Sequence, residues 1–334
     1  MYTKKFYLPI ILCGVLLAAC QTQVQFPRED TLSQELMPLQ GVTCPSFEMD
    51  VKHPYLIMQN SKRTDSIFHI YDITTYELKS AFGVIGQGPD EFLYPSIFPA
   101  QLSDVLILDR YKEDITYRFG INEDGKLVLK DTKQPNYIEG IGNGAFINDS
   151  LYVLNDLEMS PNLHLLSFQD ELPRKSWQYG NPAIINRFTD PDFGNVFAND
   201  CRIVFCYNYK KQIDFMDIDL NLLKRVKFNY DPPTVITKNN MFEIKESYST
   251  GYLGKRYFYA LFQGASINEY KKLSFRKSTL EVFDLDGNPV IKYHLDGIAP
   301  DSFIVDEKTF TLYGMRFDGE PEDYLLMYKL KGLL

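Results

Sequence analysis

The sequence predicts an all-β protein built as a six-bladed β-propeller with about four strands per blade. Two observations lead to this prediction. The chain holds many short runs rich in Val, Ile, Phe and Tyr, separated by Gly, Pro, Asn and Asp, and a hairpin pattern recurs along it. Helical periodicity is nearly absent. With 45% hydrophobic and 24% charged residues, the 334-residue chain can form a sizeable core, which excludes disorder.

Each copy of the hairpin pattern is an alternating strand, a polar turn and a second strand. The clearest copy joins Leu280–Asp284 to Val290–Tyr293 through a turn at 285–288. The copies begin at Ser66, Ile115, Leu163, Ile213, Leu280 and Tyr324. Six units over roughly 300 residues give about 50 residues per blade, within the range of propeller repeats. A pair of β-sandwiches is the alternative, but the long, regular spacing of the copies favours the propeller.

The strand that precedes each hairpin is an almost continuous apolar run, such as Val105–Asp109 or Tyr257–Phe262. Such runs are typical of strands that are covered on both faces. The last hairpin copy, Tyr324–Lys329, has no partner strand after it because the chain ends. We therefore expect Leu36–Gln40 to supply the outer strand of the sixth blade and to close the ring.

Residues 1–19 have the pattern of a secretory signal peptide. Lys4 and Lys5 precede the 14-residue apolar run from Phe6 to Ala19. As a helix this run would reach only about 21 Å, less than a hydrocarbon core of roughly 30 Å. The segment Leu17-Ala-Ala-Cys20 resembles the lipobox of bacterial lipoproteins, which implies cleavage before Cys20 and acylation of Cys20. We expect residues 20–33 to be a lipidated tether and residues 34–334 to form the propeller.

A second resemblance lies after the first hairpin. The segment Gly83-Val-Ile-Gly-Gln-Gly-Pro-Asp-Glu-Phe92 resembles the glycine-rich GxGPxEF segment of envelope lipoproteins with a TolB-like six-bladed propeller. The resemblance implies a lipoprotein of the cell envelope, anchored in the inner or the outer membrane. The family is mostly uncharacterised, so it implies no particular ligand.

The sequence favours a binding protein over an enzyme. None of the histidines forms an HxxxH or HExxH pair, and GxSxG is absent, so we expect no catalytic or metal site and no cofactor. Asp284–Asn288 resembles the start of a calcium loop, but position 12 is Leu295, so we expect a β-turn. The net charge of −9 argues against nucleic acid as a partner.

The loops after the second and fourth strands of each blade gather on one face of a propeller, and we predict that this face binds the ligand. Long loops on rigid scaffolds often carry function, and Arg is a common recognition anchor. The predicted contacts are Gln59, Asp109, Arg110, Asn155, Arg187, Asn208, Gln263, Arg276 and Arg316. The expected partners are the membrane, through lipidated Cys20, and an envelope protein or glycan.

The alternative function is a propeller hydrolase or lyase with a site in the central funnel. Such a site could depend on Ca²⁺, which oxygen ligands from several blades would hold. Asp109, Asn155 and Asn208 are the residues to inspect for it. This alternative rests on analogy of fold, which does not fix function.

Overall fold

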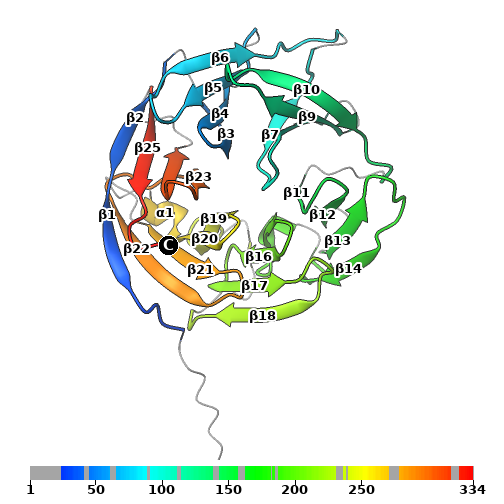
Figure 1. Ribbon diagram of the computed structural model, residues 1–334. Coiled ribbons are helices and arrows are strands. Elements are labelled where there is room, and N and C mark those ends of the chain that lie inside the picture. The colour runs from blue at the N-terminus through cyan, green and yellow to red at the C-terminus, as the bar shows by residue number, and fades with distance from the viewer. Residues whose placement is uncertain are drawn as a thin grey trace, which may run out of the picture.

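The computed structural model shows a ring of β-sheets around a central axis (Figure 1). It describes residues 24–40, 45–60, 65–88, 91–110, 114–137, 143–156, 162–181, 183–184, 187–230, 236–237, 240–270, 278–316 and 323–333. The only helical segments among these residues are η1 (Arg187–Thr189) and α1 (Ile267–Tyr270). No helix in the described part of the chain is long and apolar enough to span a membrane.

Six sheets form the blades, and the first strand of each lies nearest the axis. Blade one is β3 (Pro45–Lys52), β4 (Tyr55–Asn60), β5 (Phe68–Asp72) and β6 (Leu78–Phe82). Blade two is β7 (Pro95–Phe98), β8 (Val105–Asp109), β9 (Ile115–Ile121) and β10 (Leu127–Lys133). Blade three is β11 (Gly144–Phe146), β12 (Leu151–Asp156), β13 (Asn162–Ser167) and β14 (Lys175–Gln178).

The remaining blades complete the ring. Blade four is β15 (Gly194–Ala198), β16 (Ile203–Tyr207), β17 (Gln212–Met216) and β18 (Leu222–Lys227). Blade five is β19 (Lys245–Leu253), β20 (Tyr257–Ser266), β21 (Thr279–Asp284) and β22 (Pro289–Asp296), with β1 (Glu29–Ser33) added at its rim. Blade six is β23 (Ser302–Asp306), β24 (Thr311–Met315), β25 (Tyr324–Lys329) and β2 (Glu35–Pro38). The predicted six-bladed propeller is therefore confirmed.

The apolar runs become the second strands of the blades, where both faces are covered by neighbouring blades. Every residue of β8, β16 and β24 is buried. Their side chains contribute to several apolar clusters, one of which extends over blades five, six and one. Burial on both faces explains why these strands lack the alternation of polar and apolar residues seen in the outer strands.

The N-terminal segment closes the ring, as the sequence predicts. Strand β2 pairs antiparallel with β25 and becomes the outer strand of blade six. Met37 is fully buried and Leu39 is 5% exposed, whereas Leu36 on the opposite face is 43% exposed. Strands from the two ends of the chain thus share one sheet, which covers the edge that β25 would otherwise leave open.

Part of the predicted tether, residues 20–33, forms a strand at the rim of the propeller. Strand β1 lies within the predicted tether, yet it pairs in parallel with β22 of blade five. Leu32 is buried there, and the carboxylate of Glu29 lies 2.6 Å from Lys292 Nζ and 2.9 Å from His294 Nε2. The other residues of this strand are polar, so its pattern gives no strand signal. Residues 1–19 and Cys20 lie outside the described residues.

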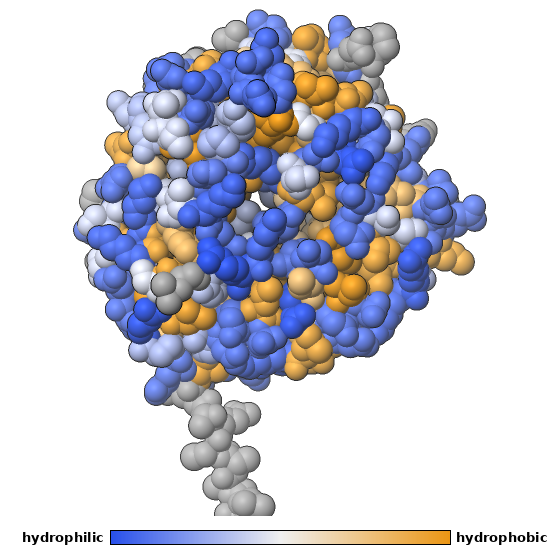
Figure 2. All heavy atoms as spheres, viewed as in Figure 1, coloured by the Kyte–Doolittle hydropathy of each residue, from blue (hydrophilic) through white to orange (hydrophobic). Residues whose placement is uncertain are grey.

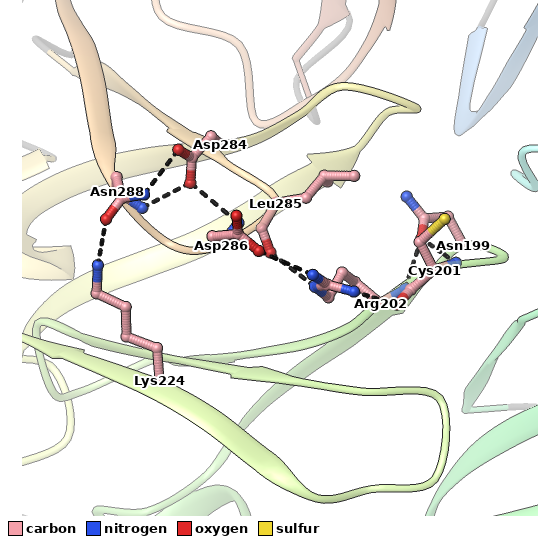
Figure 3. A network of polar contacts seen from close by, with 8 residues as sticks. All are labelled: Asn199, Cys201, Arg202, Lys224, Asp284, Leu285, Asp286 and Asn288. Carbon is pink, nitrogen blue, oxygen red and sulfur yellow. Dashed lines mark hydrogen bonds and ion pairs between the residues drawn. The ribbon is translucent and has the colours of Figure 1, made fainter.

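Neighbouring blades are joined at the rim by a repeated polar contact (Figure 3). In blade five, Asp284 Oδ1 accepts hydrogen bonds from the backbone N–H groups of Asp286 and Asn288, which confirms the predicted turn. Lys224 of β18 donates to Asn288 Oδ1 at 2.6 Å. Two further pairs repeat this contact between the outer strand of one blade and the turn of the next: Lys175 with Asn221, and Ser80 with Gly125.

Replacing Met37 with Ala should lower the free energy of unfolding by about 2–4 kcal/mol, because it leaves a cavity where β2 seals blade six. Urea denaturation followed by circular dichroism measures this change. The matched control is Leu36→Ala on the exposed face of the same strand, which should change stability by no more than about 0.5 kcal/mol. Equal effects of the two substitutions would show that β2 does not seal the blade.

Candidate functional site

Three adjoining hollows lie along the axis of the ring, and together we call them the channel. We call the hollow at one end the turn mouth, because it lies at the turns between the first and second strands of the blades; its volume is about 750 Å³. The waist has about 280 Å³, and the loop mouth at the other end about 310 Å³. Figure 2 shows an opening at the centre of the ring, bordered mostly by hydrophilic residues.

Neighbouring hollows adjoin one another, because they have lining residues in common. The turn mouth and the waist have Ala100, Gln101 and Tyr252 in common. The waist and the loop mouth share Gly144, Val196, Phe197 and Thr250. The side-chain amide of Gln101 in blade two donates to the hydroxyl of Tyr252 in blade five at 2.8 Å, so a hydrogen bond crosses the axis where the turn mouth meets the waist.

Three of the predicted contact residues bind backbone at the entry to an inner strand. Gln59 donates to the carbonyl oxygen of Pro95 at 2.9 Å, and the Asn155 amide donates to that of Gly194 at 3.1 Å. Asp109, which is fully buried, accepts from the N–H groups of Leu93 and Tyr94 at 2.8 and 2.9 Å.

These contacts position the first strands of blades two and four. Of the three residues, Asn155 lines the loop mouth. A ligand contact by any of them stays a prediction.

The other predicted residues are spread over the loop face. Asn208 accepts a hydrogen bond from Asn195 at 3.1 Å, and exposed Arg110 lines the waist together with Glu48. Burial raises the pKa of Glu48, and the charge of Arg110 opposes that rise. Gln263 and Arg316 are partly buried near the ends of β20 and β24.

The last two predicted residues are arginines. Arg187 begins η1, and Arg276 lies outside the described residues. The loop face therefore collects most of the predicted positions, but the turn mouth, at the opposite end of the channel, is the larger of the two mouths.

The turn mouth takes its lining from four blades. Turn residues of blades one, two, five and six line it, among them His53, Ser103, Arg256 and Lys308. No residue of this group was predicted from the sequence, since each lies in a short turn that has the composition of ordinary surface. The sequence carries no local signal for them, because only closure of the ring brings these turns around one hollow.

A histidine and an aspartate from opposite ends of the chain meet at the turn mouth. His53 Nδ1 lies 2.9 Å from Asp306 Oδ2. The hydroxyl of Thr309 donates to the same carboxylate at 2.8 Å, and the N–H of Lys308 donates to its other oxygen at 3.0 Å. The aspartate, which is 3% exposed, therefore fixes the orientation of the imidazole ring beside the hollow.

A buried ion pair supports the same wall. Lys52 Nζ lies 2.8 Å from Asp50 Oδ2 and donates to the carbonyl oxygen of Ala100 at 2.6 Å. Burial raises the pKa of Asp50 to about 6, and Lys52 opposes that rise. The ammonium group of Lys52 is thus held by protein groups, and the contact with Ala100 connects blade one to blade two.

The three residues named for a calcium site, Asp109, Asn155 and Asn208, follow strands of different blades, and each has a hydrogen-bond partner in the protein. Within the described ranges, no three His, Cys, Asp or Glu side chains gather in a way that could hold a metal ion. Asp109 and Asn155 are engaged with backbone groups in different blades, as described above.

Comparison with known proteins identifies the fold. No protein-family model matches the chain, and no curated protein matches its sequence. Among solved structures, a member of the DUF4221 family from Bacteroides vulgatus is similar, with a TM-score of 0.55 and 12% identity over 92% of this chain and 98% of that one.

A second similar structure comes from Bacteroides fragilis, and its name proposes that it is an exported protein. Its TM-score is 0.55, with 8% identity over 90% of this chain and 98% of that one. At such low identity, both similarities establish the fold alone.

Proposed function

We propose that this protein is a membrane-anchored binding protein of the cell envelope that holds its ligand in the central channel. The observation that carries the proposal is the turn mouth, a hollow of about 750 Å³ lined by side chains from four blades. Ligand sites in proteins are commonly concave hollows of about 300–1,000 Å³ with a few polar groups that converge on them. The volume is sufficient for a small ligand or for the end of a longer chain.

The proposed location rests on the N-terminal sequence. The signal-peptide pattern and the lipobox segment that ends at Cys20 favour export and lipid attachment. One of the two similar structures carries the name of an exported protein, which agrees with this proposal. The lipid would hold the propeller at the membrane, and β1 begins nine residues after Cys20 (29 − 20).

Replacing Cys20 with Ser should remove the acylation site and release the protein from the membrane fraction. Fractionation of the envelope, together with metabolic labelling by a fatty-acid analogue, measures both effects. The wild-type protein should carry the label and pellet with membranes. A variant that stays in the membrane fraction with its label intact would contradict lipid anchoring.

Filling the turn mouth tests ligand binding. Ser103 is exposed and lines the hollow, so Ser103→Trp should obstruct it without disturbing the core. Thermal melting is measured with neutral sugars, acidic sugars, amino acids and short peptides. A ligand present at 100 times its Kd stabilises the folded state by about 2.7 kcal/mol. We expect at least one class to stabilise the wild type and not the variant.

The matched control is Ser150→Trp, an exposed residue in the corresponding turn of blade three that does not line the hollow. It should respond to ligands as the wild type does. Equal ligand responses of Ser103→Trp and the wild type would place binding elsewhere, and no response to any class would contradict the proposed function.

One observation favours the enzymatic alternative, namely the imidazole of His53 held by Asp306 at the turn mouth. A histidine oriented in this way is suited to act as a general base in a hydrolase or a lyase. The same binding experiment distinguishes the two functions if the ligand is recovered and weighed by mass spectrometry. An unchanged ligand supports a binding protein, and a product that forms with the wild type but not with His53→Gln supports an enzyme.

A further inference from the structure

The turn mouth gathers cations on a protein whose overall charge is negative. The chain has 44 acidic and 35 basic residues, a net charge of −9. Nevertheless, the turns of blades five and six place Lys255, Arg256 and Lys308 at this mouth, and all three are exposed. Cations outnumber carboxylates in the lining of this hollow, and an excess of one sign of charge in a hollow concentrates ions of the opposite sign.

The carboxylate of Glu307, which lies among these cations, is used within the protein. It accepts hydrogen bonds from the backbone N–H groups of Lys255 at 2.8 Å, of Arg256 at 3.0 Å and of Tyr257 at 3.2 Å. The hydroxyl of Tyr259 donates to it at 3.1 Å. Glu307 thus joins blade six to the turn of blade five. Most of the hydrogen bonds that its carboxylate accepts come from backbone N–H groups.

The two other carboxylates that line the mouth are also engaged. Asp104 lies 2.6 Å from Lys130 Nζ and 3.7 Å from Arg118 Nε. Asp306 is held by His53, by Thr309 and by a backbone N–H group. Neither acid is paired with the cations of blades five and six.

Lys255 and Lys308 have no carboxylate partner within the described part of the chain. The guanidinium of Arg256 is held in place by two contacts. It donates to the carbonyl oxygen of Glu307 at 2.5 Å, and it lies 4.4 Å from the centre of the Phe310 ring. A guanidinium fixed in this way keeps further N–H donors for an anion, and it loses little conformational entropy on binding one.

We propose that the turn mouth is an anion site, in which Lys255, Arg256 and Lys308 bind the carboxylate or phosphate group of a small polar ligand. The inference rests on the proposed function and adds the chemical class of the ligand. The uncharged part of the ligand would lie in the hollow, toward Gln101 and Ser103. A neutral analogue would lack the group that these three cations recognise.

Three hexoses that differ in one position test the inference: glucose, glucuronate and glucose 6-phosphate. Their affinities for the folded protein are measured by isothermal titration calorimetry at matched ionic strength. We expect the two anionic sugars to bind and glucose not to bind. Added sodium chloride should weaken the binding of both anions, because salt screens exposed charges.

The test variant combines Lys255→Gln, Arg256→Gln and Lys308→Gln, and it should bind the anionic sugars at least about thirtyfold more weakly. The matched control combines Lys126→Gln, Lys227→Gln and Lys331→Gln. These lysines are exposed and do not line the channel, so this triple variant makes the same change in net charge. It should bind as the wild type does, and both variants should keep the wild-type circular dichroism spectrum.

Each contrary result has its own meaning. If glucose binds as tightly as the anions and Ser103→Trp abolishes all binding, the binding function stands and the anion site is wrong. If both triple variants lose affinity equally, the loss comes from the change in net charge. The proposal that Lys255, Arg256 and Lys308 form an anion site is then also wrong. If none of the three hexoses binds to the wild type, the anion site is contradicted, and the broader ligand panel then decides the proposed function.

Discussion

The backbone pairing of β2 with β25 is the constraint on which the rest of the structure depends. A propeller blade has exposed edges unless the ring closes, and here the closing strand comes from the opposite end of the chain. Residues 29–38 contribute rim strands to two adjacent blades, because β1 extends blade five and β2 completes blade six. The channel keeps its width only while the six blades are held in this circle.

Polar contacts between neighbouring blades also hold the ring together, at positions closer to the axis than the rim strands. At the boundary of blades four and five, Lys211 Nζ lies 2.6 Å from Glu281 Oε1 and 3.8 Å from the centre of the Phe262 ring. The hydroxyl of Tyr248 donates to the other oxygen of Glu281 at 2.6 Å, and burial raises the pKa of Tyr248 well above its usual value. Removing one member of such a buried pair would leave an uncompensated charge, which is strongly destabilising.

The same kind of contact explains why the second strands end in polar residues. Gln59 and Asn155 reach the first strand of the following blade, so they set how adjacent blades meet around the channel. Because the blades are held in these positions, the turn residues of different blades face one another at the end of the channel. His53 and Asp306, 253 residues apart in the chain, come within hydrogen-bond distance because the ring brings blade six beside blade one.

The blades could be predicted from the sequence because their signals are local. Apolar runs such as Val105–Asp109 and turns such as Asp284–Asn288 depend on neighbouring residues alone. Strand β1 could not be predicted, since four of its five residues are exposed and its partner β22 lies more than 250 residues away.

The turn mouth could not be predicted for a related reason. Lys255 and Lys308 look like ordinary solubilising residues until ring closure places their turns around one hollow. The long loops at the other end of the channel gave the stronger local signal and directed the prediction to that face.

Amide hydrogen exchange measured by mass spectrometry tests ring closure most directly. The comparison is between the protein with residues 24–40 and the protein without them. We expect that removal of these residues abolishes slow exchange in blades five and six, including the inner strand β23, and lowers protection around the turn mouth. Unchanged protection of β23 and β25 in the shortened protein would contradict this expectation, because the ring would then hold without its closing strand.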